Sequence, residues 1–132
     1  MAQTKLVNPW KWQDQFQFSQ GIDVRGAERL LYCAGQTSVD AEGAPMHAGD
    51  MPAQINQALS NLETVLRQAG LTLANVVRLN YYTTDVPAFL EAGADYGPRL
   101  QAAGCQPAST LLGVASLFHP DILVEIEATA VV

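Results

Sequence analysis

The stretch "ILVEIEATAVV", from Ile122 to Val132, decides the fold that we expect for this chain. Successive side chains of a β-strand point to opposite faces of the sheet, so alternation along the sequence separates the two faces. One face here would carry only aliphatic residues, and the other Glu125, Glu127 and Thr129. The segment therefore predicts a strand with one face against an apolar core and the other in a more polar environment.

Two segments have the signals of helices that could cover the apolar face. Apolar residues recur at helical spacing over Asp50–Gly70, which starts with a capping aspartate, has Pro52 in its first turn and stops at a glycine. A second helix is predicted over Asp85–Gly104. Because Gly97 and Pro98 lie inside it, we expect a kink near Gly97.

Four further segments have the composition of strands: Phe16–Val24, Arg29–Gly35, Asn75–Asp85 and Ser109–Ala115. In the third, alternation predicts one face made of Val77, Leu79 and Tyr81. The order is then β-β-α-β-α-β-β. This order predicts a single α+β domain over residues 1–132, with one mixed sheet and two helices on one of its faces.

The sheet face away from the helices is of mixed character. It would carry Glu125 and Glu127 together with Leu123 and Val131. Such a face is too apolar for full exposure to water and too charged for a sealed core. Burial of this face against another subunit, with a cleft at the interface, would suit both its apolar and its charged residues, so the pattern predicts an oligomer.

The formal net charge of −6 argues against a nucleic-acid partner. Only seven basic residues occur, and they are scattered, whereas nucleic-acid binding depends on Lys and Arg that neutralise phosphates. Residues 1–16 lack the apolar core of a signal peptide, and no stretch approaches the roughly 20 apolar residues that span a bilayer. We therefore expect a cytoplasmic protein with no membrane partner, in which Cys33 and Cys105 are reduced.

Few groups in the sequence suit catalysis. His47 and His119 have no partners at metal-ligand spacing, and no nucleotide-binding or nucleophile motif occurs, so we predict neither a metal nor a cofactor. Glu125 and Glu127 would lie roughly 7 Å apart on one strand face. Either this face is a solvated strand edge, or it lies in a cleft where burial suits a carboxyl to proton transfer, with Glu125 the stronger candidate. Cys105 is more typical of a structural thiol than of a nucleophile.

Six short motifs, in this order and spacing, carry a family resemblance. They are "FSQG" (Phe18–Gly21), "CAGQTSVD" (Cys33–Asp40), "QINQALSNLETVLRQAG" in the first helix, "YYTTDVPAF" (Tyr81–Phe89), "PAST" (Pro107–Thr110) and "VEIEATAV" (Val124–Val131). The chain resembles the reactive-intermediate deaminase (Rid, or YjgF/UK114) family of imine and enamine hydrolases. The resemblance implies a chorismate-mutase-like fold and a homotrimer that binds small molecules in clefts between subunits.

The same resemblance implies a carboxylate-binding arginine that this chain lacks. Active deaminases of the family have Pro-Ala-Arg-Ser/Thr in the loop before the fourth strand, and Ser109 stands at the arginine position. Hydrogen bonds to charged groups contribute about 1.5–3 kcal/mol, so this loss would weaken binding of small carboxylates ~10–150-fold. To supply another cation, Arg78 or Arg99 would have to reach the cleft.

Other implied pocket positions are partly changed and partly kept. The usual tyrosine, serine and cysteine are replaced by Phe18, Ala34 and Leu111. The retained residues are Gly35, Thr110 and Glu125, and the last matches the family's water-orienting carboxylate. These changes favour an imine or enamine hydrolase whose substrate lacks the usual carboxylate. The alternative is a non-catalytic trimer that binds a small molecule, and a ribonuclease is least favoured because the chain is acidic.

Overall fold

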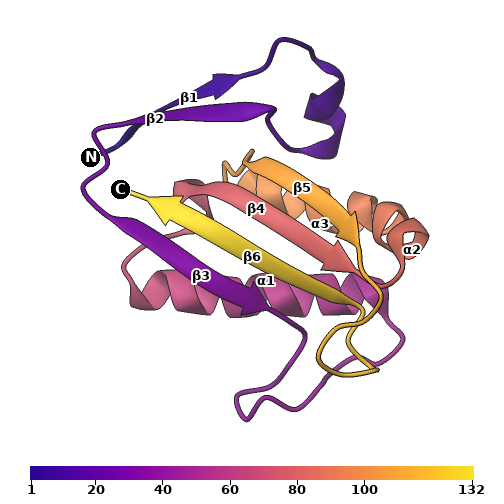
Figure 1. Cartoon of the computed structure of the whole chain (residues 1–132). Helices are drawn as coiled ribbons and strands as arrows, with labels where there is room; N and C mark the ends of the chain where they lie inside the picture. The colour runs from indigo at the N-terminus through magenta and orange to yellow at the C-terminus, as the bar shows by residue number, and fades with distance from the viewer.

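A four-stranded mixed sheet with three helices on one face makes up the body of the chain (Figure 1). The computed structural model describes all of residues 1–132. The strand order is β3-β6-β4-β5, with β6 antiparallel to both of its neighbours and β5 parallel to β4. The bounds are β3 Leu30–Gln36, β4 Val76–Thr83, β5 Ala108–Gly113, β6 Val124–Val131, α1 Met51–Gln68, α2 Val86–Glu91 and α3 Gly93–Ala102. The predicted α+β class, with a mixed sheet covered on one face, is confirmed.

The sequence signals at both ends of α1 act as predicted. The Asp50 side chain accepts a hydrogen bond from the Ala53 N–H at 3.1 Å, and Pro52 occupies the first turn. Gly70 follows the helix with a φ of +77°, a conformation that favours glycine. The apolar stripe of α1 packs against β6 and β3 and includes the fully buried residues Ile55, Ala58, Leu59, Leu62 and Leu66.

The second predicted helix is two helices, and the break lies elsewhere than we expected. The chain turns at Ala92, between α2 and α3, and Pro98 lies inside α3. Ala92 is almost fully buried, and the Asp95 N–H bonds back to its carbonyl only three residues away, as in a 3-10 turn. Gly93, which has a low helix propensity, begins the new direction. The predicted helix is therefore interrupted at Ala92, before the position where we expected the kink, and α3 runs through Gly97 and Pro98.

The register of β4 also differs from simple alternation. Val76 pairs with Ala130 of β6, and Arg78 pairs with the adjacent residue Thr129. Val77 is therefore an extra residue in β4, which makes a bulge. Val76 therefore joins Leu79 in the core, where it is 4% exposed, while Val77 is only half-buried. A bulge inserts an unpaired residue and so shifts the alternation that a sequence pattern assumes.

The N-terminal segment forms a sheet of its own. Strands β1 (Gln3–Val7) and β2 (Gly21–Arg25) pair antiparallel, joined by a chain that contains a 3-10 helix, Trp12–Phe16. Figure 1 shows this hairpin apart from the main sheet. The predicted strand Phe16–Val24 is thus correct only from Gly21, it does not join the mixed sheet, and β1 was not predicted. All five residues of β1 are exposed, so neither face of this strand requires apolar residues and its sequence has no alternating pattern.

The sheet face away from the helices is open in the single chain. It carries the partly exposed polar side chains of β4 and β6 together with exposed Leu30, Tyr32 and Leu112. Leu123, expected on this face, instead packs against the core, and Val131 is buried. The mixed character that we predicted is present, although other apolar residues supply it. None of the helices has the length and apolar character needed to cross a membrane.

Candidate functional site

A cavity of about 890 Å³ lies between the 3-10 helix with its following segment and the pair α2–α3. This volume is in the range of small-molecule sites. Three of the positions singled out in the sequence line it: Phe18, Ser109 and Leu111. Its other lining residues include four aromatic side chains, Phe16, Tyr81, Phe89 and Tyr96.

Polar contacts between two distant loops hold Phe18 in this wall. The Gln17 Nε2 donates to the carbonyl of Cys105 at 3.0 Å, and the Ser19 N–H donates to the carbonyl of Pro107 at 2.9 Å. The Gln106 Nε2 in turn donates to the carbonyl of Phe18 at 3.2 Å. The segment after the 3-10 helix is therefore fastened to the loop that leads into β5, which places Phe18 and Ser109 in the same cavity.

The inner wall of the cavity is a cluster of three aromatic rings. The ring centroids of Tyr81 and Phe89 are 5.0 Å apart, and those of Phe89 and Tyr96 are 5.4 Å apart. Burial raises the pKa of Tyr96 to about 12 and raises the pKa of Tyr81 well above its ordinary value. Both phenols are therefore neutral at physiological pH and contribute shape and apolar surface rather than charge.

A second group of predicted site residues gathers on the open face of the sheet. Glu125 is half-buried there, and its carboxylate packs directly over Gly35 of β3. Ala34 is exposed beside Gly35. Thr110 lies on the same face, where its Oγ1 accepts a hydrogen bond from Arg78 Nη2 at 3.0 Å. The Glu125 oxygens have no hydrogen-bond or ion-pair partner within the chain, so they are free to bind a water molecule or a substrate.

The sheet itself separates the two groups within one chain. Ser109 pairs with Leu79, and Leu79 pairs with Ala128 of β6. Paired residues share a face of the sheet, so Ser109 lies on the same face as Ala128. Glu125 is three residues from Ala128 along β6 and therefore points to the opposite face. The chain therefore brings Phe18, Ser109 and Leu111 together, and brings Gly35 together with Glu125, but it does not join these two sets.

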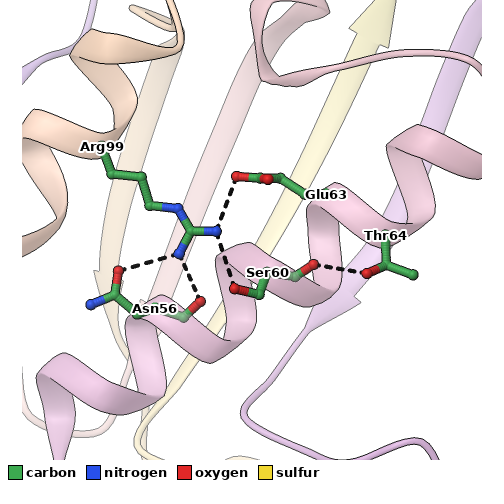
Figure 2. A network of polar contacts seen from close by, with 5 residues as sticks. All are labelled: Asn56, Ser60, Glu63, Thr64 and Arg99. Carbon is green, nitrogen blue, oxygen red and sulfur yellow. Dashed lines mark hydrogen bonds and ion pairs between the residues drawn. The ribbon is translucent and has the colours of Figure 1, made fainter.

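Neither candidate arginine lines the cavity. Arg99 extends from α3 to α1, as Figure 2 shows. There it donates a hydrogen bond to the Asn56 carbonyl at 3.0 Å and forms an ion pair with Glu63 at 3.0 Å. Arg78 lies on the open face beside Thr110. It is thus Arg78, and not Arg99, that shares a face with Glu125.

The second carboxylate of β6 is occupied by its neighbours. Glu127 Oε1 accepts hydrogen bonds from the Tyr82 hydroxyl and from Asn80 Nδ2. The bond from Tyr82 and then that from Asn80 hold the pKa of Glu127 below its ordinary value, and the bond to Glu127 raises the pKa of Tyr82. Glu127 is therefore an ionised acceptor with a structural partner, which leaves Glu125 as the carboxylate available for chemistry.

Several residues that line the cavity had not been singled out for function. They include Asp14, Phe16, Gln17, Gly93 and Gln101. Asp14 and Phe16 belong to the 3-10 helix, for which the sequence has no strong periodic signal. Phe89 and Tyr96 lie within the single helix that we predicted over Asp85–Gly104, but the structure places them on two helices, on either side of the break at Ala92. The aromatic spacing of Phe16 and Phe18 is the one local signal that could have marked this wall.

Comparison with known proteins agrees with this architecture. Residues 13–132 match the endoribonuclease L-PSP family model. The chain is 35% identical to a RutC family protein of Synechocystis, over 86% of this chain and 85% of the relative. It is 32% identical to the 2-iminobutanoate/2-iminopropanoate deaminase of Mus musculus, over 86% of this chain and 80% of that protein.

A solved structure extends the match to nearly the whole fold. It is that of the Rid family protein YyfB of Yersinia pestis, described as of unknown function, with a TM-score of 0.81, 35% identity and coverage of 98% of both chains. The chain therefore belongs to the Rid (YjgF) protein family and has its chorismate-mutase-like α+β fold.

Proposed function

We propose that the protein is an imine or enamine hydrolase, a deaminase that works as a homotrimer with its site between subunits. The observation that carries this proposal is the state of Glu125: half-buried, packed over Gly35 and free of any partner in the chain. A carboxylate with those properties can take a proton from a water molecule as it attacks a carbon. The relation to named deaminases of the family supports the same chemistry.

The reaction balances with water as the only co-reactant. Glu125 accepts a proton as the water oxygen bonds to the C=N carbon of the protonated imine. The resulting amino alcohol takes that proton on nitrogen. As its C–N bond breaks, Glu125 accepts the hydroxyl proton and passes it to the departing ammonia, so that the products are a carbonyl compound and ammonium. An enamine would first tautomerise to the imine. The chain supplies the base and the pocket, and the relay needs neither metal nor cofactor.

The separation of Glu125 from the cavity supports a site between subunits. Because they lie on opposite faces of one chain, a substrate that uses both must contact two copies. The open face of β3, β6, β4 and β5, with exposed Leu30, Tyr32 and Leu112, is a suitable surface for that contact. Glu125 of one subunit would then face Phe18, Ser109 and Leu111 of the next.

Turnover of an imine without a carboxylate tests the chemistry. We expect the protein to release benzophenone from benzophenone imine, a stable N–H ketimine, faster than buffer does. Glu125→Gln should lower that rate about 100-fold or more, because a neutral amide cannot accept the proton. Glu127→Gln is the matched control and should keep most activity. Equal rates for wild type and Glu125→Gln, across several imines, would refute the proposal.

Mixed oligomers test the shared site. Glu125→Gln subunits and subunits whose cavity is filled by Leu111→Trp should each be inactive alone. In a random one-to-one mixture, about a quarter of the interfaces would combine an intact Glu125 with an intact cavity and regain activity. A mixture that stays inactive, although the two chains co-assemble, would place the complete site within one chain.

A non-catalytic binding protein is the second candidate. It is favoured by the cavity, which has five aromatic side chains and no basic side chain in its lining. It predicts ligands that raise the melting temperature but are recovered unchanged. A ribonuclease finds no support in the charge of −6 or in the cavity lining.

A further inference from the structure

The charge of the cavity is the opposite of what a carboxylate-binding pocket needs. Of its 16 lining residues, Asp14 alone is charged, and none is Lys, Arg or His. Ser109, at the position where the family resemblance implies an arginine, uses its hydroxyl locally at 3.4 Å from the Pro107 carbonyl. Within one chain, a bound anion would meet the negative charge of Asp14 and no positive charge. The lining that a single chain supplies therefore disfavours a carboxylate.

Asp14 is oriented without being neutralised. Its Oδ1 accepts hydrogen bonds from Gln106 Nε2 at 3.0 Å and from Gln13 Nε2 at 3.3 Å. Gln13 is itself fully buried and also donates to the Trp10 carbonyl at 2.8 Å, so the carboxylate is supported from behind. Both donors are neutral amides, Asp14 takes part in no ion pair, and its Oδ2 has no partner. One negative oxygen is left for a ligand.

Aromatic rings accompany this carboxylate around the cavity. Phe16 and Phe18 share its wall, and Trp12 meets the Phe18 ring edge to face with centroids 5.7 Å apart. Phe89 and Tyr96 form the opposite wall on α2 and α3. The face of an aromatic ring attracts a cation, and the apolar surface of these rings suits a large hydrocarbon group. Carboxylate and rings together match an ammonium or iminium group on an apolar body.

We infer that this cavity binds organic cations, namely primary amines and protonated imines that carry an aromatic or branched apolar group and no carboxylate. The inference deepens the proposed function and rests on it for the role of the cavity. An iminium ion is the reactive form of an imine, so the same features that exclude 2-aminoacrylate-type substrates would favour its uncarboxylated counterparts. Amines would bind as unreactive analogues of the substrate.

Three probes of similar size and different charge test the inference by calorimetry: benzylamine, benzyl alcohol and benzoate at neutral pH. We expect benzylamine to bind about tenfold more tightly than benzyl alcohol, and benzoate to bind most weakly. Asp14→Asn should reduce benzylamine binding to the level of the alcohol and leave the alcohol unchanged. Glu42→Gln, at an exposed loop residue, is the control for the change in net charge.

A second variant acts in the other direction. Ser109→Arg puts a cation into the cavity and should reverse the order, with benzoate above benzylamine. Benzoate binding to the wild type as tightly as benzylamine, or an Asp14→Asn variant that keeps the preference for benzylamine, would overturn the inference.

The binding measurement separates this inference from the proposed function. Calorimetry reports the order of the three probes whether or not the protein hydrolyses any imine, and the variant that tests binding, Asp14→Asn, leaves Glu125 unchanged. Amine binding without hydrolysis of any imine would leave the inference standing and refute the deaminase. Hydrolysis of imines together with equal binding of the three probes would do the reverse.

Discussion

The side chain of Glu125 occupies the space that a Cβ atom would need at Gly35. That Cβ would lie 2.7 Å from Glu125 Cγ, well inside van der Waals contact. The φ of Gly35 is not in the left-handed region, so position 35 needs glycine for room rather than for backbone freedom. The register of β3 against β6 shifts between Cys33 and Gln36, next to this contact. The two residues thus form one structural unit of the site.

Gly35→Ala should therefore act as a Glu125 variant. We expect the added methyl group to displace the flexible carboxylate and to lower imine hydrolysis at least tenfold, with a small change in melting temperature. Gly21→Ala is the matched control, since its Cβ would meet Val7 Cβ at an ordinary 3.6 Å. Steady-state rates and thermal unfolding of both variants check the prediction. Full activity in Gly35→Ala would show that the position of the carboxylate is unimportant.

Ser109→Arg should give the protein activity toward carboxylated imines. The new guanidinium would enter the cavity and bind a substrate carboxylate through charge-assisted hydrogen bonds. We expect pyruvate release from enzymatically generated 2-aminoacrylate to rise ~10–150-fold. If wild type and variant are both inactive on every imine tried, the change from the family pattern goes beyond this position. The binding-protein alternative would then be favoured.

Arg99 should stabilise the packing of α3 on α1 rather than act in catalysis. Its guanidinium has four acceptors on α1, and its side chain is 27% exposed. Arg99→Met should cost about 1–2 kcal/mol of unfolding free energy, a value reduced for partial exposure. Glu63→Gln should cost less than about 1 kcal/mol, because the other acceptors remain. Urea unfolding measures both, and equal losses would show that the ion pair with Glu63 dominates.

The Tyr82–Glu127 hydrogen bond should make stability depend on pH at both extremes. The pKa of Glu127 is lowered, so its contribution is complete above the ordinary value of 4.5 and is lost as the pH falls through the lower folded value. The pKa of Tyr82 is raised, so its contribution is complete below 10.0 and is lost as the pH rises through the higher folded value.

Tyr82→Phe tests this pair. The variant should be less stable than the wild type at pH 7, and the difference should shrink between pH 7 and pH 3, because Glu127 gains its proton only as the pH falls below the ordinary value of 4.5. Denaturant unfolding at both pH values measures the change. A difference that is constant between them would mean that the lost hydroxyl acts through packing rather than through the charged acceptor.

Both thiols should be inert in the folded protein. Burial raises the pKa of Cys105 to about 12 and also raises the pKa of Cys33 above its ordinary value. Because the thiolate is the reactive form, neither residue should react within minutes with a disulfide reagent at pH 8, and both should react in denaturant. Rapid labelling of the native protein would contradict the burial of these residues.

Local sequence patterns predicted the helices and strands that have one buried face and whose ends are marked by capping residues, proline or glycine. The stripe and caps of α1 and the alternation of β6 needed no distant contact, and so the position of Glu125 opposite the core side of β6 followed from the sequence. The family motifs also singled out Ser109, Phe18 and Leu111, and the structure places all three in one cavity.

Only the tertiary structure decided how those positions are grouped. The cavity depends on bonds such as that from Gln17 to Cys105, 88 residues away, and on a break at Ala92 that local propensity placed later. The sheet places Ser109 and Glu125 on opposite faces, a relation set by strand register across β4. The charge of the cavity, carried by Asp14 alone, likewise arises only when the N-terminal segment folds back over β5. Local spacing determines which side of its own strand or helix a residue faces, whereas contacts between distant segments determine which residues meet.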